Sequence, residues 1–332
     1  MTDEAEQRRR KKRLMAIAVV VFRVAVLAAV AACVVHTVVK SVGQFREAEF
    51  SLADVDYRWL AAACSLYLAG LAMSWLFWHR VLVAMGQRPT MWESLRAFYL
   101  SQLGKYVPGK AMVVVLRTDA VRSDRVDTTV AATSVFVETL TAMAVGSLTA
   151  AVLLSVLFAH ETYLLLLSLG LMLCAGVPVL PPVFRRLVRI VGVRRANPAI
   201  DEALAGLNWR VMLFGWFATA IGWWLYGASL WATLRAMPDV VVDAGHWPLV
   251  TACVSLAVVA GFVSMLPGGV GVRELVVMTL LAPAFGQVPA ILSAVLLRLV
   301  WLVSEAVVSI ILYPMGRARR QKHDVPPSPP AN

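Results

Sequence analysis

The sequence Leu-Pro-Gly-Gly-Val-Gly-Val-Arg-Glu at Leu266–Glu274 interrupts a long apolar part of the chain. The segments on its two sides, Trp247–Met265 and Leu275–Phe285, both have the composition of membrane-embedded helix. Because proline lacks a backbone N–H and glycine loosens the backbone, we expect the helix to break here. Unpaired backbone groups at membrane depth are tolerated only where protein or a water-filled cavity surrounds them. The stretch therefore predicts either a functional break inside the membrane or an ordinary loop at its surface.

The composition of the whole chain indicates a helical membrane protein. Its 332 residues are 60% hydrophobic and only 15% charged, and its mean hydropathy is +0.73. Soluble domains are about 45–50% apolar and about a quarter charged. The period-2 alternation of a membrane β-barrel is absent, so we predict an all-α, polytopic bundle. The net charge is +11, and most of the basic residues lie in a few segments between helices. This distribution indicates how the helices are oriented in the membrane and contact with anionic lipid headgroups, and it gives little support to nucleic-acid binding.

Six apolar segments are long enough to cross a bilayer. They are Leu14–Val39, Trp59–Trp78, Thr128–Ala159, Tyr163–Leu180, Val211–Leu234 and Gly286–Met315. Residues 1–13 form a basic N-terminus, and Leu14–Val39 is too long for a cleaved signal peptide. We therefore expect one transmembrane domain over residues 14–315, followed by a disordered tail at 316–332.

Residues 80–127 contain a second interrupted stretch. Two apolar pieces, Ala97–Leu103 and Ala111–Leu116, are each too short to span, and Pro108 and Gly109 lie between them. This pattern favours a re-entrant hairpin of two half-helices. The competing interpretation is an amphipathic helix in the membrane interface, followed by a loop.

The distribution of basic residues sets the expected topology. Lysine and arginine concentrate in the N-terminus, residues 80–127, residues 183–210 and the tail, which predicts that all four are cytoplasmic. Six crossings satisfy this if residues 247–285 form a second hairpin that opens outward. The two halves would then form an inverted repeat, in which interrupted segments mark the binding site of many transporters. If Trp247–Met265 crosses fully, the chain has seven or eight transmembrane helices.

Charged residues at the two breaks are the candidate ligands for a phosphate headgroup, because arginine and helix N-termini suit phosphate oxygens. We expect Lys105, Lys110 and Arg117 to act at the first break, and Arg273 and Arg298 at the second. The broken backbone would be supplied by Pro108, Gly109, Pro267, Gly268, Gly269 and Gly271. Glu138, Glu274 and Glu305 would hold the basic side chains or neutralise them in the empty site. In the alternative interpretation, Arg273–Glu274 and Arg298–Glu305 are pairs that only lock helix packing.

The sequence contains no motif that indicates catalysis, metal binding or cofactor binding. Cys33, Cys64, Cys174 and Cys253 lie in apolar segments at no ligand spacing, and the five histidines are scattered. There is no nucleotide-binding, metalloprotease or hydrolase motif, and no cluster suggests acid–base work. We therefore expect no enzyme activity, no metal and no cofactor.

With its two motifs the chain resembles the transmembrane-region family of lysylphosphatidylglycerol synthases, also called flippase-like domain proteins. The resemblance rests on Gln102–Lys110, Leu266–Glu274 and Leu297–Trp301, and covers roughly residues 14–315. Glu138 stands where such proteins carry an acidic residue, although their Glu-Arg pair is Glu138-Thr139 here. The family implies a bundle that moves lipids, typically an aminoacylated phosphatidylglycerol, between leaflets. We expect the soluble synthase domain of those proteins, and its activity, to be missing.

The expected function is a lipid translocase or lipid-binding protein for an anionic phospholipid or polyprenyl-phosphate, in the plasma membrane with both termini cytoplasmic. Without an ATP-binding motif, movement would be downhill or coupled to an ion gradient. Two alternatives remain. The first is a membrane scaffold that docks a separately encoded enzyme through residues 183–210 and the tail. The second is an intramembrane lipid transferase.

Overall fold

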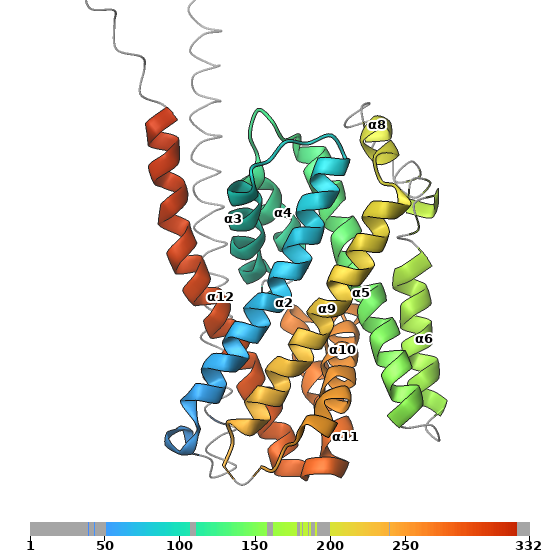
Figure 1. Ribbon diagram of the computed structural model, residues 1–332, viewed down its shortest axis with the longest axis vertical. Helices are drawn as coiled ribbons and strands as arrows, with labels where there is room; N and C mark the ends of the chain where they lie inside the picture. Colours follow the sequence, from blue (N-terminus) through green and yellow to red (C-terminus); the bar gives the residue numbers. More distant parts are fainter. Residues whose placement is uncertain are drawn as a thin grey trace, which may run out of the picture.

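The computed structural model describes residues 51–106, 111–157, 162–177, 200–238 and 240–323, together with a few positions outside these ranges. In this part of the chain the secondary structure is helical and contains no strand, which confirms the all-α prediction (Figure 1). Among the described residues, five helices are long and apolar enough to cross a membrane. They are α2 (Tyr57–Ala84), α5 (Thr128–Leu157), α9 (Trp209–Arg235), α10 (Trp247–Val263) with the short turn before it, and α12 (Gln287–His323) up to Met315.

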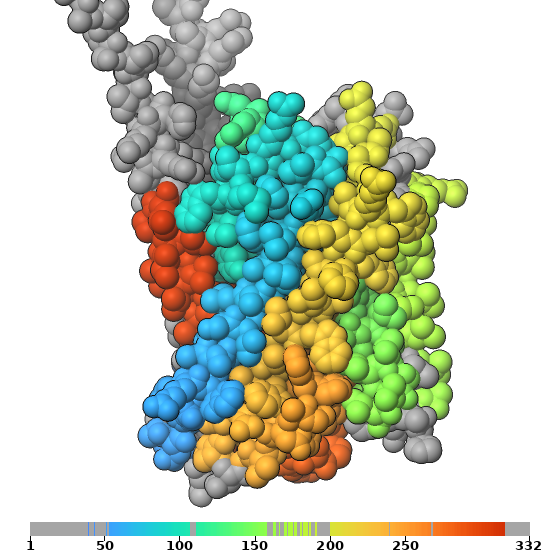
Figure 2. Space-filling model, in the orientation of Figure 1, coloured from blue at the N-terminus to red at the C-terminus, as the bar shows by residue number. Residues whose placement is uncertain are grey.

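Helices α2 and α9 pack along each other over most of their length, as the adjacent blue and yellow bands of the space-filling view show (Figure 2). Their close approach depends on glycine. A Cβ atom on Gly70 would lie 2.5 Å from the ring of Tyr226 and 3.1 Å from the carbonyl oxygen of Gly222. Small residues at such a crossing let the two backbones approach, which is how helices associate where lipid offers no hydrophobic driving force.

Two short helices, α3 (Met91–Gln102) and α4 (Ala111–Val121), pack against each other in the upper half of Figure 1. A capping box between Thr90 and Glu93 starts α3. The 3-10 turn η2 (Leu103–Tyr106) ends it, so both predicted apolar pieces form helices too short to span.

A second pair of neighbouring helices lies in the lower half of Figure 1. Helix α10 ends at Val263, the 3-10 turn η6 (Pro267–Gly269) follows, and α11 (Val272–Phe285) packs back against α10. The predicted helix break is therefore confirmed. Asp243 caps the turn before α10, and its hydrogen bond with His246 lowers the pKa of its carboxyl group.

The remaining elements refine the sequence-based boundaries. Helix α6 (Thr162–Gly176) pairs with α5, and α8 (Ile200–Ala205) packs near it. The predicted first span, Leu14–Val39, lies almost wholly outside the described residues. Helix α12 continues to His323, so residues 316–323, which we expected in the disordered tail, are helical. A basic segment directly after an apolar helix can extend it, because lysine and arginine are good helix formers.

Candidate functional site

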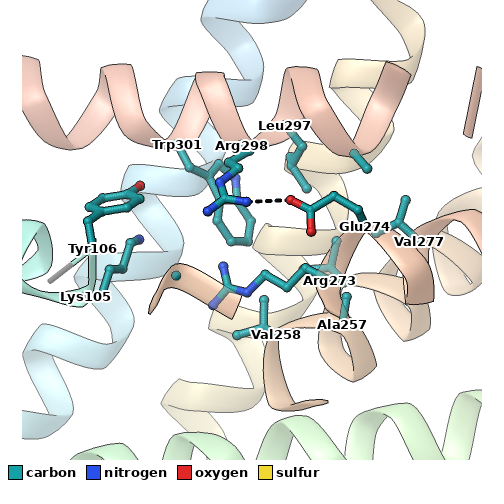
Figure 3. Close-up of a pocket in the computed structure, with 13 residues that line it drawn as sticks. Lys105, Tyr106, Ala257, Val258, Arg273, Glu274, Val277, Leu297, Arg298 and Trp301 are labelled. Carbon is teal, nitrogen blue, oxygen red and sulfur yellow. Dashed lines mark hydrogen bonds and ion pairs between the residues drawn. The ribbon is translucent and has the colours of Figure 1, made fainter. Parts of the chain in front are cut away.

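The two helix breaks, which lie more than 150 positions apart in the chain, meet in the middle of the bundle. Turn η2 contacts turn η6, and a Cβ atom on Gly268 would lie 3.6 Å from the ring of Tyr106. Lys105 comes from η2, Arg273 from the first turn of α11 and Arg298 from α12, and all three point into one space (Figure 3). We call these three residues together with Glu274 and Glu305 the cation cluster.

Glycines at the second break let the backbone lie against the cluster. Gly268, Gly269 and Gly271 all have positive φ angles, a conformation that other residues rarely adopt. A Cβ atom would lie 2.9 Å from a terminal nitrogen of Arg298 if built on Gly268, and 2.9 Å from Nε of Arg273 if built on Gly269. The three glycines predicted as site residues therefore set the geometry of the break, and two of them make room for the arginines.

Glu274 joins the break to α12. Its Oε1 accepts a hydrogen bond from Nη1 of Arg298 at 2.5 Å, and its Oε2 accepts one from the backbone N–H of Gly271 at 2.6 Å. The Arg273–Glu274 pair of the alternative interpretation is not formed. Neighbouring residues on a helix point in different directions, so Glu274 faces α12 while Arg273 faces the break.

Glu305 binds Lys105 and not Arg298. The Arg298–Glu305 pair of the alternative interpretation is therefore not formed either. One oxygen of the Glu305 carboxylate accepts hydrogen bonds from the ammonium group of Lys105 and from the hydroxyl group of Tyr67. Residues seven apart on α12 lie two turns from each other, so Arg298 and Glu305 are drawn to different neighbours. The other oxygen, Oε2, is buried and has no hydrogen-bond partner among the described residues.

Aromatic rings surround the Lys105 ammonium group. It lies 5.3 to 6.0 Å from the ring centroids of Tyr67, Tyr106 and Trp301, within the range of cation–π attraction. Tyr67 and Trp301 stack with their centroids 4.5 Å apart. We did not predict Tyr67, Tyr106 or Trp301 as site residues. Tyr67 could have been recognised from the sequence. It is a tyrosine in the middle of an apolar span, where its hydroxyl group needs a hydrogen-bond partner.

Arg273 is the arginine of the cluster that lacks a carboxylate. Within the described residues it makes no ion pair, and its Nε is buried with no hydrogen-bond partner. Burying a guanidinium N–H without an acceptor is costly, which makes Arg273 a candidate for binding a ligand. Three basic side chains against two carboxylates leave the cluster with a net charge of +1.

Arg117 and Glu138 form a separate buried pair between α4 and α5. Nη1 of Arg117 donates to the Glu138 carboxylate at 2.7 Å, and its Nε donates to the Ser101 hydroxyl at 3.0 Å. The guanidinium group also lies over the ring of Phe98, 4.3 Å from its centroid. Two of its three nitrogens are thus engaged within the protein, which distinguishes Arg117 from Arg273.

Two cavities meet at the cluster. A central cavity of about 560 Å³ is bounded by α4, α5, α9 and the end of α10, and it reaches from the Arg117–Glu138 pair to Lys105 and Arg273. A second cavity of about 40 Å³ lies between α10, α11 and α12, behind Glu274 and Arg298. Lys105, Gly268 and Arg273 line both. The larger cavity has the size of a ligand site, whereas the smaller one holds only water-sized groups.

Three of the predicted site residues, Pro108, Gly109 and Lys110, lie outside the described residues, and for Pro267 only the backbone in η6 is described. No group of three or more histidine, cysteine, aspartate or glutamate residues that could hold a metal ion occurs in the described part of the chain.

Comparison with known proteins supports the resemblance that the motifs suggested. No curated protein matches the chain. The family described as the lysylphosphatidylglycerol synthase TM region matches residues 15–308, a range that contains all of the predicted site residues and both helix breaks. Since this match covers most of the sequence, the chain belongs to the lysylphosphatidylglycerol synthase TM region family of membrane proteins.

Proposed function

We propose that this protein binds a lipid with an anionic, phosphate-bearing headgroup at the cation cluster and moves it between the two leaflets without chemical conversion. The observation that carries the proposal is Arg273, whose Nε is buried without a partner where the two helix breaks meet. A phosphate oxygen would supply that partner. It would also neutralise the net charge of the cluster, and arginine suits phosphate because its planar donors bind two oxygens at once.

The shape of the central cavity suits the rest of a lipid. Its walls are mostly apolar, and four large apolar residues that line it, Val115, Phe136, Met265 and Leu266, are exposed rather than buried in the core. Such a cavity has polar groups at its inner end and an apolar side opening toward the membrane. A headgroup would reach Arg273 while its hydrocarbon chains stay in the apolar part of the cavity or in the bilayer.

The arrangement of the broken helices supports movement between leaflets. We propose that α3–α4 and α10–α11 are re-entrant hairpins that enter the membrane from opposite sides, as their positions in the upper and lower halves of Figure 1 suggest. Although α10 is long enough to cross a bilayer, α11 packs back against it. Small shifts of either hairpin would expose the cluster to one side at a time, as in transporters built from inverted repeats.

The orientation follows from the loops at the two ends. Arg80, Arg88, Arg122 and Arg125 lie at or beyond the upper ends of α2 and α4, whereas the loops at the lower end carry Asp54, Asp56 and Asp243. By the positive-inside rule, this distribution supports our proposal that the upper end faces the cytoplasm, and we propose the plasma membrane as the location. In a cysteine-free background, Asp124→Cys should react with an impermeant reagent only from the cytoplasmic side, and Val241→Cys only from the outer side. The reverse pattern would overturn this orientation.

The decisive test is mass spectrometry of the lipids that copurify with the full chain. We expect one class of phosphate-bearing lipid to be enriched over the bulk membrane in the wild type and lost in Arg273→Gln. Arg235→Gln is the matched control, because it removes the same charge from an exposed site at the end of α9. If wild type and both variants carry only bulk lipid, the headgroup site is overturned. A retained lipid would next be followed in vesicles by a leaflet-exchange assay.

A further inference from the structure

Glu305 differs from every other carboxylate of the site in its surroundings. Its side chain is fully buried, whereas those of Glu274 and Glu138 are 21% and 7% exposed. Both hydrogen bonds that the structure shows go to the same oxygen, from Lys105 and Tyr67, and Oε2 is left buried without a donor. An ionised carboxylate with an oxygen in that position bears a desolvation cost, and protonation of the carboxylate would lower this cost because it removes the buried charge.

Glu305 binds the Lys105 ammonium group, which a phosphate headgroup in the central cavity would also use. Lys105 lines both cavities and lies in the same space as Arg273 (Figure 3). While Glu305 is ionised, the Lys105 ammonium group is engaged by its carboxylate. Once Glu305 is neutral, Lys105 can turn its charge to a phosphate oxygen in the central cavity.

We propose that Glu305 is a proton-binding site that couples anion binding to proton uptake, so that one proton travels with each anionic headgroup. The inference rests on the proposed function. The proton passes from a hydronium ion in the central cavity through the Tyr67 hydroxyl group to the Glu305 carboxylate. One O–H bond of the hydronium ion breaks, one O–H bond forms on the carboxylate, and no other covalent bond changes in the net step. The cluster then carries a net charge of +2, and a monoanionic headgroup returns it to +1. Because each binding step makes the other more favourable, proton and lipid bind as coupled ligands.

Among the described residues, the groups around Glu305 supply a path for the proton and include no histidine or second carboxylate that would compete for it. The groups that interact electrostatically with Glu305 come from the elements packed around it: Tyr67 of α2, Lys105 and Tyr106 of η2, and Tyr226 of α9. Arg273 and Arg298 act on it through Lys105. Helix α3 also packs on α12, but its Arg96 binds the carbonyl groups of Leu312 and Tyr313, beyond Glu305. Tyr67 lines the central cavity and donates to Oε1 of Glu305, so its hydroxyl group can relay a proton to that oxygen.

The test measures the binding of short-chain phosphatidylglycerol to the full chain in detergent, over about pH 5 to 9. This lipid keeps one negative charge in that range, whereas a phosphate monoester would itself titrate near pH 6. We expect the affinity of the wild type to fall by about tenfold per pH unit once Glu305 is ionised. Calorimetry in buffers of different ionisation enthalpy should show uptake of about one proton per lipid.

Glu305→Gln keeps a carbonyl oxygen for Lys105 and Tyr67 but cannot ionise. It should bind with the low-pH affinity of the wild type at every pH and take up no proton. His79→Gln is the control for the histidine of α2, which ordinarily titrates in the same range, and it should keep the pH dependence of the wild type. Wild-type binding that does not vary with pH and takes up no proton would overturn the coupling and leave the headgroup site intact. A wild type that binds no lipid at any pH would overturn both.

A second variant covers the case in which Glu305→Gln does not fold. Tyr67→Phe removes one hydrogen bond to the Glu305 carboxylate and leaves Lys105 in place. Since that bond favours the ionised form, the loss of affinity should begin at a higher pH than in the wild type. If Tyr67 were only a packing residue, the variant would change the affinity equally at every pH, and that result would contradict the proposal.

Discussion

The Glu274 carboxylate binds Arg298, 24 positions further along the chain, and leaves its direct neighbour Arg273 without a carboxylate. The reason is geometric, because adjacent helix residues point in different directions and only one of them can face α12. This choice of partner separates the two arginines of the second break. Within the described residues, Arg298 has a carboxylate partner and Arg273 has none, which is why we propose Arg273 as a headgroup ligand.

Glu274→Gln should lower stability through two losses, the ion pair with Arg298 and the strong acceptor for the Gly271 N–H. Both side chains of the pair are mostly buried, so we expect a cost of about 2 kcal/mol. Thermal unfolding in detergent measures it. The control is Arg125→Gln, which breaks the exposed pair with Glu93 and should cost less than about 1 kcal/mol. Equal effects of the two variants would show that Glu274 has no special structural role.

Lys105→Met should be strongly destabilising, because it leaves the Glu305 carboxylate buried with Tyr67 as its remaining donor among the described residues. Removing one partner of a buried pair costs about 3–5 kcal/mol. Adding Glu305→Gln to this variant removes the stranded charge, so the double variant should recover part of the lost stability. A double-mutant cycle by thermal unfolding checks this, and strictly additive effects would argue against a direct pair.

Gly269→Ala should disturb the site more than Gly271→Ala. Both glycines have positive φ angles, so both substitutions bear a backbone strain of about 1–3 kcal/mol. Only at Gly269 does the new Cβ atom also meet Arg273 and Gly261, whereas nothing lies within 4 Å at Gly271. We expect Gly269→Ala to lose the copurifying lipid and Gly271→Ala to retain it. Loss of the lipid in both variants would point to strain in the break as the cause.

Glu138→Gln should reduce stability without changing which lipid is bound. The substitution removes the carboxylate from Arg117, which is buried between α4 and α5, and we expect a cost of about 3 kcal/mol. Lipid identity, measured per folded protein, should match the wild type because two nitrogens of Arg117 are already engaged. A changed lipid class in Glu138→Gln would place Arg117 in the headgroup site after all.

Much of the fold was predictable, since it depends on local chemistry. The apolar segments that the structure describes are helices, and Pro267 with its following glycines ended α10, because span length and backbone breaking are properties of short stretches. The extent of α12 beyond Met315 was missed, since a basic composition permits both a helix and a disordered tail. The aromatic surroundings of Lys105 were missed as well, because Tyr67 and Trp301 lie about 40 and 200 positions from it.

The amino-acid sequence by itself determined that this chain is a membrane helix bundle with two broken segments and an excess of basic residues beside them. Composition, proline and glycine act within a few residues and need no partner. Only the tertiary structure decided which carboxylate holds which cation and which arginine is left over. A buried ion pair forms between groups that packing brings within about 4 Å. That distance is set by the meeting of η2, α11 and α12, segments that the sequence keeps far apart.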